Sequence, residues 1–256
     1  MSRAESVQPS VTALMVTRNR PSLRERALKC FDAQTYANKS VLILDTSGGI
    51  GHDLREGGIS VIRSDNTVMA YRPPSNFTIG ELRNMALGLT TRDTEIVIHL
   101  DDDDWSHPNR IAEQVVLLQS SGADCVGYRE MLFWKQPDGE AWLYSNRDPR
   151  YCLGTSLCYW RKTWERKPFE ATSQGDDHLF TLGLKCVSVT SIFDVHNDPY
   201  IDVLPNGEAD KTPRMIARIH AGNTSNAYDP ADMRKASEWK RVPEWDSHAR
   251  WIMEGK

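Results

Sequence analysis

An apolar run, Ile-Val-Ile-His-Leu at residues 96–100, leads directly into four consecutive aspartates at residues 101–104. The run has the length and composition of a buried β-strand. Four neighbouring carboxylates repel one another and lose hydration, so a divalent cation or several hydrogen-bond donors should compensate them. The alternative is a solvated acidic turn before a helix that begins near Pro108. We favour a ligand site, because open α/β sheets bind ligands outside the carboxyl ends of their strands.

Strand and helix patterns alternate through the first half of the chain. This alternation is typical of a mostly parallel sheet that is covered by helices on both faces. The polar side chains that follow the strands should then gather along one edge of the sheet. The predicted strands are residues 11–16, 41–44, 59–62 and 95–100, and the predicted helices follow Pro21 and span residues 79–89.

The second half of the chain has a different pattern. Gln-Pro-Asp-Gly at residues 136–139 is typical of a hairpin turn, so this part of the sheet should be antiparallel or mixed. Residues 226–256 are polar with interspersed tryptophans, and we expect a helical or wrapping C-terminal tail there. The other predicted elements are a helix from Pro108, strands at residues 124–128, 131–134, 141–144 and 214–220, and a helix at residues 176–184.

Composition limits the class of protein. The 256 residues, 39% of them hydrophobic and 26% charged, are typical of a globular α/β domain. The sequence has neither an apolar run of the roughly 20 residues that a membrane span needs nor a signal-peptide core in residues 1–10, so we expect a cytoplasmic protein. A net charge of −4 argues against a uniformly basic nucleic-acid surface, although residues 18–26 and 161–167 form local basic patches.

The sequence contains five cysteines, an odd number, and they are scattered along the chain. They lack the paired spacing of a zinc site and the density of a disulfide framework. We therefore predict free thiols in a reducing compartment.

Polar side chains follow three of the predicted strands and should converge on a nucleotide-sized site. Thr17 and Asn19 follow the first strand, Asp45 the second, and the aspartates at 101–104 the fourth. The Asp45 carboxylate can accept from the imide N–H of a pyrimidine, and the four aspartates can bind ribose hydroxyls and a divalent ion. Arg83 can add a positive charge. The sequence lacks a glycine-rich phosphate loop, so a metal should neutralise much of the phosphate charge.

Five motifs in order give the chain a resemblance to the family 2 glycosyltransferases of the GT-A fold over about residues 10–225. The resemblance implies a Rossmann-like, mixed but mostly parallel central sheet flanked by helices. It also implies a single domain over residues 1–225, with a nucleotide-sugar-binding half at about 10–105 and an acceptor half at 106–225. The motifs are VTRNR at 16–20, LDTS at 44–47, GELRN at 80–84, LDDDD at 100–104 and GDD at 175–177.

The implied activity is inverting, divalent-metal-dependent transfer of a hexosyl group from a nucleotide sugar, with a UDP-sugar as the expected donor, to an acceptor hydroxyl. By the resemblance, Thr17 and Asp45 hold the base and Arg83 approaches the diphosphate. Asp102 contacts the ribose, and Asp103 binds Mn²⁺ or Mg²⁺. Four aspartates in a row leave the register of this element open by one residue, so Asp101 is a candidate as well.

Two further positions take roles from the resemblance. Asp176 and Asp177 stand where the family has a Glu-Asp pair whose second member is the general base. Their alternative role is a charge pair at a helix N-terminus. His220 is similar to a late histidine that completes the metal shell, and its alternative is a hydrogen-bonded structural role. The sequence departs from the family pattern at Thr46, where a second acid is frequent, and at Asp176, where glutamate is commoner.

The acceptor and some other activities stay open. A carbohydrate, a lipid-linked sugar, a protein side chain or a small molecule can supply the acceptor hydroxyl, and so can a modified base of DNA. A sugar-phosphate nucleotidyltransferase is a second possibility, although its expected glycine-rich loop is missing from residues 17–21. A non-catalytic nucleotide-sugar-binding module is a third. The sequence makes no prediction of the oligomeric state.

Overall fold

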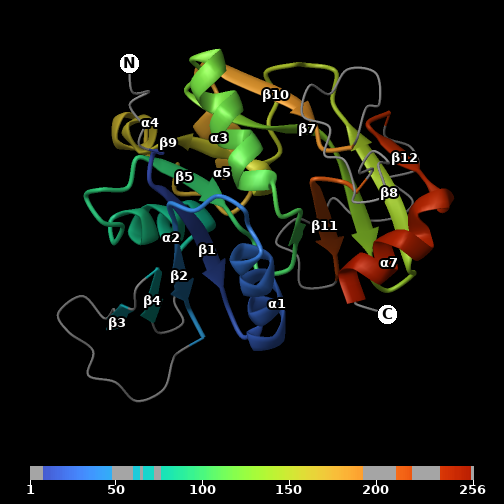
Figure 1. The fold of residues 1–256 in the computed structure, drawn as a ribbon, viewed down its shortest axis with the longest axis horizontal. Coiled ribbons are helices and arrows are strands. Elements are labelled where there is room, and N and C mark those ends of the chain that lie inside the picture. The colour runs from blue at the N-terminus through green and yellow to red at the C-terminus, as the bar shows by residue number, and fades with distance from the viewer. Residues whose placement is uncertain are drawn as a thin grey trace, which may run out of the picture.

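The computed structural model describes residues 8–47, 60–63, 66–71, 76–192, 212–220 and 237–254. In these residues the chain forms one mixed sheet of twelve strands with helices on both faces (Figure 1). The strands are, in chain order, β1 (Val11–Thr17), β2 (Lys39–Asp45), β3 (Ser60–Arg63), β4 (Thr67–Tyr71), β5 (Ile96–His99), β6 (Trp105–Ser106), β7 (Cys125–Lys135), β8 (Glu140–Ser145), β9 (Cys158–Trp160), β10 (Cys186–Thr190), β11 (Met215–Ile219) and β12 (Trp239–Arg241). The helices are α1 (Pro21–Asp32), α2 (Ile79–Leu87), α3 (Arg110–Ser121), α4 (Arg161–Arg166), α5 (Asp176–Thr181) and α7 (Asp246–Glu254), with the 3₁₀ turns η1 (Gly154–Ser156) and η2 (Pro243–Trp245).

The main path of the sheet has the strand order β12-β8-β7-β9-β5-β1-β2-β4-β3, and β10 and β11 also pair with β7. The pairings place β1, β2, β4, β5, β7, β10, β11 and β12 in one direction, and β3, β6, β8 and β9 against them. This arrangement confirms the predicted mixed, mostly parallel sheet. It also brings the carboxyl ends of β1, β2 and β5 to the same edge.

Side chains that alternate along the central strands pack into two separate cores. On one face, Ala13 and Met15 of β1 pack with Phe31 of α1 and Val115 of α3. On the other face, Leu14 packs in a core that includes side chains of α2 and α5. Strands that are buried on both faces need apolar side chains at every position. This requirement explains the continuous apolar runs of β2 and β5.

Local sequence signals set the ends of the helices around the site. Pro21 is the first residue of α1, where its fixed φ suits a helix and its missing N–H costs nothing. Thr78 and Glu81 form a reciprocal capping box at the start of α2. Gly122 ends α3 with a φ of 58°, a conformation that glycine adopts without strain. The cap of α2 places Arg83 just beyond the first turn of that helix.

Several short elements were not predicted. The strands β4, β9 and β10 and the helix α4 have no counterpart in the sequence prediction. The predicted strands at 124–128 and 131–134 are one continuous strand, β7, and the predicted helix at 176–184 ends at Thr181. The strand β9 has three residues and is inserted between β5 and β7, so its burial depends on the tertiary fold and leaves no periodic pattern.

The C-terminal residues join the sheet at the end opposite β3 (Figure 1). Residues 226–236 of the predicted tail lie outside the described residues. Beyond them β12 pairs antiparallel with β8, and α7 packs Ala249 and Met253 against Leu132 and Trp134. No helix in the described ranges is both long enough and apolar enough to cross a membrane.

Candidate active site

The register of the parallel strands explains why the ends of β1, β2 and β5 carry one site. Thr17 pairs with Asp45 across β1 and β2. Leu14 pairs with His99 at the end of β5, and Thr17 and Asp102 each lie three residues further along the chain from this pair. The Thr17 hydroxyl donates to Asp102 Oδ2 at 2.5 Å. The three predicted strand ends therefore do converge.

Arg20 supplies positive charge to the aspartates. It lies between β1 and α1, and its guanidinium donates to Asp102 Oδ1 at 3.1 Å and to Asp103 Oδ2 at 3.3 Å. The chain reaches it through Asn19, whose φ of 56° makes a tight left-handed turn. The sequence prediction did not assign a role to Arg20. The sequence did contain one signal for Arg20, because this residue closely follows a predicted strand whose end was expected to carry a ligand site.

Asp45 is held on the other side of this turn. Its Oδ2 atom accepts from Arg24 of α1 at 2.5 Å, and its Oδ1 atom accepts from the Ser47 hydroxyl and from the Ser47 N–H. The Asn19 N–H donates to Ser47 Oγ at 2.6 Å. These hydrogen bonds connect the end of β1 to the end of β2.

Asp103 meets His220 at this edge. His220 Nε2 and Asp103 Oδ2 are 2.8 Å apart, and His220 follows directly after β11. The carboxylate oxygen suits both Mn²⁺ and Mg²⁺, whereas the imidazole nitrogen suits Mn²⁺ better than Mg²⁺. Such ions can be held by one or two protein ligands together with substrate phosphates. The pair therefore fits the predicted metal site.

Asp104 is bonded to two segments from the second half of the chain. Its carboxylate accepts from the Thr155 hydroxyl and from the Arg218 N–H, which is 3.0 Å from Oδ1. Burial, together with the neighbouring Asp103 and Asp101, raises the pKa of Asp104 well above its ordinary value. Asp104 thus ties η1 and β11 to the aspartate run. Arg218 also donates from Nε to the Asp103 carbonyl at 3.2 Å.

Arg83 and Asp176 form a buried ion pair that joins α2 to α5. The Arg83 guanidinium also lies 5.5 Å from the centre of the Phe169 ring and within the electrostatic range of Asp101 and Asp177. Burial raises the pKa of Asp101 and of Asp176, and Arg83 opposes both rises. Arg83, which the resemblance assigns to the diphosphate, is therefore placed among three carboxylates in this structure.

Asp177 lies half-buried against the backbone of η1. A Cβ atom added to Gly154 would come within 1.9 Å of Asp177 Oδ2, so the carboxylate fills the space that a side chain would need there. Asp177 Oδ1 accepts from the His178 N–H at 2.9 Å. Because Thr155 is bonded to Asp104, the dipeptide Gly154-Thr155 contacts both Asp177 and the aspartate run.

His99 is a packed, buried residue. Its Nδ1 atom lies 2.8 Å from the Gly154 carbonyl oxygen, and its Nε2 atom lies 3.3 Å from the Tyr159 hydroxyl. Burial, with smaller contributions from Arg83 and Arg110, lowers the pKa of His99 well below its ordinary value. A neutral ring that donates from Nδ1 and accepts at Nε2 satisfies both contacts. His99 therefore holds the start of η1 in place through the Gly154 carbonyl oxygen.

Comparison with known structures gives the same fold. The protein is similar to S. aureus TarS 1–349 in complex with UDP-GlcNAc, with 13% identity and a TM-score of 0.58 over 96% of this chain and 71% of that one. It is also similar to TarS 1–349 in complex with UDP, with 12% identity and a TM-score of 0.55 over 82% of this chain and 60% of that one. The chain thus spans about 60% of the length of TarS 1–349 in that comparison, and it covers 37% of TarS itself.

A second neighbour is the mannosyltransferase PcManGT from Pyrobaculum calidifontis in complex with GDP-Man and Mn²⁺. It has 16% identity and a TM-score of 0.50 over 72% of this chain and 55% of that one. No curated protein matches the sequence itself. The structural likenesses confirm the predicted GT-A type of fold. The family model for glycosyl transferase family 2 matches residues 12–167, more than half of the chain, and the protein therefore belongs to that family.

Proposed function

We propose that the protein is an inverting, divalent-metal-dependent glycosyltransferase that moves a sugar from a UDP-sugar to an acceptor hydroxyl. One observation carries the proposal: Gly154-Thr155 contacts Asp177 on one side and is bonded to Asp104 on the other. This contact brings a half-buried carboxylate close to the aspartate run. In this account residues 10–105 bind the nucleotide and residues 106–225 supply the acceptor side.

Asp177 is the proposed general base. An acceptor hydroxyl is a poor nucleophile until a positioned base takes its proton. The hydroxyl oxygen bonds to the anomeric carbon, the bond from that carbon to the diphosphate oxygen breaks, and the proton passes to the Asp177 carboxylate. Attack from the side opposite the departing nucleotide inverts the anomeric centre. The half-exposed position of Asp177 supports this role, because an acceptor must reach the carboxylate.

The nucleotide is proposed to bind at the edge of the sheet where the carboxyl ends of β1, β2 and β5 meet. In this proposal Thr17, Asn19 and Asp45 contact the base, and Asp101 and Asp102 contact the ribose. The complexes of TarS with UDP and UDP-GlcNAc support a uridine nucleotide. The GDP-Man complex of PcManGT makes a guanosine nucleotide the alternative donor to test.

Asp103 and His220 are the proposed metal ligands. When bound there, Mn²⁺ or Mg²⁺ would supply Lewis-acid stabilisation of the negative charge that develops on the diphosphate. Arg20 adds a positive charge beside Asp102 and Asp103. The Mn²⁺ in the complex of the structural neighbour PcManGT supports this proposal.

A turnover assay tests the base assignment. We expect release of UDP from at least one UDP-sugar, in the presence of Mn²⁺ and a panel of hydroxyl acceptors. The variant Asp177→Asn should lower kcat by at least about 100-fold, since a general base contributes roughly 10²–10⁴-fold. The matched control Asp148→Asn changes an exposed aspartate on a surface turn and should leave kcat unchanged. Full turnover by Asp177→Asn would reject Asp177 as the base.

A further inference from the structure

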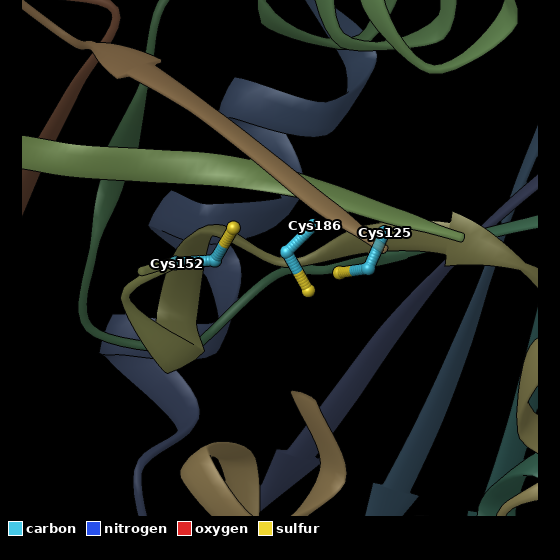
Figure 2. A group of neighbouring side chains, drawn as sticks. All are labelled: Cys125, Cys152 and Cys186. Carbon is cyan, nitrogen blue, oxygen red and sulfur yellow. The ribbon is translucent and has the colours of Figure 1, made fainter. Parts of the chain in front are cut away.

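Three of the five cysteines, which are far apart in the sequence, meet in the core. Cys125 begins β7 and Cys186 begins β10, and the two are register partners in this parallel pair. Cys152 comes from the segment just before η1. The three side chains are 0%, 3% and 6% exposed, and their sulfur atoms lie within 4.8 Å of one another (Figure 2). The sequence, in which the cysteines lack a metal-site spacing, did not predict this cluster.

The thiols make weak hydrogen bonds to one another and to backbone carbonyl oxygens around them. The sulfur of Cys125 lies 3.6 Å from the Val126 carbonyl oxygen, and that of Cys186 lies 3.7 Å from the Thr181 carbonyl oxygen. Cys152 makes similar contacts at 3.8 and 4.0 Å. A thiol is a weak donor even at shorter distances. The sulfur atoms are therefore not committed to strong partners in the fold and remain available to a ligand.

The geometry suits a soft metal ion. Zinc–sulfur bonds are about 2.3 Å long, so three thiolates around one ion lie roughly 4 Å apart. The sulfur atoms are within 4.8 Å of one another before any adjustment. The side-chain ligands that meet here are sulfur atoms, in a core that includes Leu157 and Phe180, and thiolate sulfur suits soft metal ions better than Mg²⁺ or Mn²⁺.

We propose that Cys125, Cys152 and Cys186 bind one thiophilic metal ion, Zn²⁺ or Cu⁺, through three thiolates. Each thiol releases its proton when the ion binds, so one ion displaces three protons. This site is separate from the proposed Asp103 and His220 ligands, and it does not depend on the proposed catalytic function.

The position of the cluster gives the ion a structural role. Cys152 lies two residues before Gly154, which contacts Asp177. Cys186 begins the strand that follows α5, the helix that carries Asp177. An ion bound by all three cysteines would link these two segments to β7 and so help to hold η1 and α5 together.

Cobalt binding to the 256-residue protein tests the proposal. The reduced, metal-free protein is titrated anaerobically with Co²⁺ alone, and thiolate-to-cobalt charge-transfer absorption is recorded. We expect saturation at one Co²⁺ per chain, with loss of the absorption when Zn²⁺ or Cu⁺ is added. The variants Cys152→Ala and Cys186→Ala should lose the absorption. The matched control Cys158→Ala removes a cysteine that is equally buried but outside the cluster, and it should keep the absorption.

His220→Ala separates the two sites, because cobalt bound at Asp103 and His220 gives no thiolate band. This variant should keep the full absorption. No thiolate band in the folded wild-type protein, or an unchanged band in Cys152→Ala, would overturn the proposal. If the cluster variants fail to fold, X-ray absorption of the wild-type protein loaded with zinc decides the question. A shell of three sulfur atoms at about 2.3 Å is expected, and a shell of oxygen and nitrogen alone would reject the site.

Discussion

The four consecutive aspartates have different hydrogen-bond partners, and these partners indicate a different role for each aspartate. Asp102 and Asp103 share Arg20, and Asp103 also meets His220. Asp104 is bonded to Thr155 and to the backbone of β11, so it is used to hold the site together. Like charges can be close neighbours only where each has compensating donors. The sequence predicted that compensation was needed but could not say which segment would supply each donor.

His99 makes the stability of the protein depend on pH. Burial holds its pKa below the unfolded value of about 6.5, so the unfolded chain takes up a proton first as the pH falls. Stability from this group is complete above pH ~6.5 and decreases below it, by at most about 1.4 kcal/mol per pH unit. We expect His99→Gln to flatten the pH dependence of the free energy of unfolding between about pH 5 and 6.5, measured by chemical denaturation at each pH.

The control for this prediction is His178→Gln. His178 is exposed on α5, so its replacement should leave the slope as it is in the wild-type protein. An identical slope in His99→Gln and the wild-type protein would show that His99 is protonated equally in the folded and unfolded states.

Among the helices and strands, the contact between η1 and α5 is the one on which the proposed activity most depends. In Gly154→Ala the new Cβ would lie 1.9 Å from Asp177 Oδ2 and 2.7 Å from its Cβ, so the Asp177 side chain must move. We expect kcat to fall at least tenfold, equal to about 1.4 kcal/mol in the barrier, with little change in the KM for the donor. Steady-state kinetics on the donor measures both constants.

Gly88→Ala is the matched control. Gly88 has helical φ and ψ at the end of α2, and an added Cβ would first meet the Met85 carbonyl oxygen at 3.4 Å. It should keep the wild-type kcat. Equal kcat values for Gly154→Ala and the wild-type protein would mean that Asp177 is not held by this contact during catalysis.

Elements with a strong local pattern were predictable, and elements defined by their neighbours were not. The helices α1, α2 and α3 have apolar stripes together with a proline or a capping residue, and the sequence located all three. The strand β9 has three residues and is defined by pairing with β5 and β7. The same difference explains the site. The family resemblance indicated Asp177 and His220, whereas Thr155 was given no role because only the folded chain brings it to the aspartates.

Across the full fold, the C-terminal helix is connected to the site through Arg218. The Arg218 guanidinium donates to the Met253 carbonyl oxygen at 2.9 Å and to the Asp103 carbonyl oxygen at 3.2 Å. The Met253 side chain is fully buried against the core that contains Trp134. Residues near the C-terminus thus support the aspartates from the far end of the sheet.

Met253→Ala should therefore destabilise the protein. Removing a buried methionine side chain costs about 2–5 kcal/mol, because the loss of transfer free energy is added to the cost of a cavity. Trp251→Ala is the control on the same helix, since Trp251 is 60% exposed and its loss should have a much smaller effect. Urea denaturation compares the two variants. Equal stabilities of Met253→Ala and the wild-type protein would show that α7 adds little to the fold.

The proposed donor site is tested most directly by calorimetric titration of the protein with UDP. The titration is done with Mn²⁺ and with a chelator, and it is repeated on Asp103→Ala. We predict Mn²⁺-dependent binding of UDP to the wild-type protein and at least a tenfold loss of affinity, about 1.4 kcal/mol, in the variant. Failure of the folded wild-type protein to bind UDP, or equal affinity for UDP in Asp103→Ala, would contradict a metal-dependent UDP site at these aspartates.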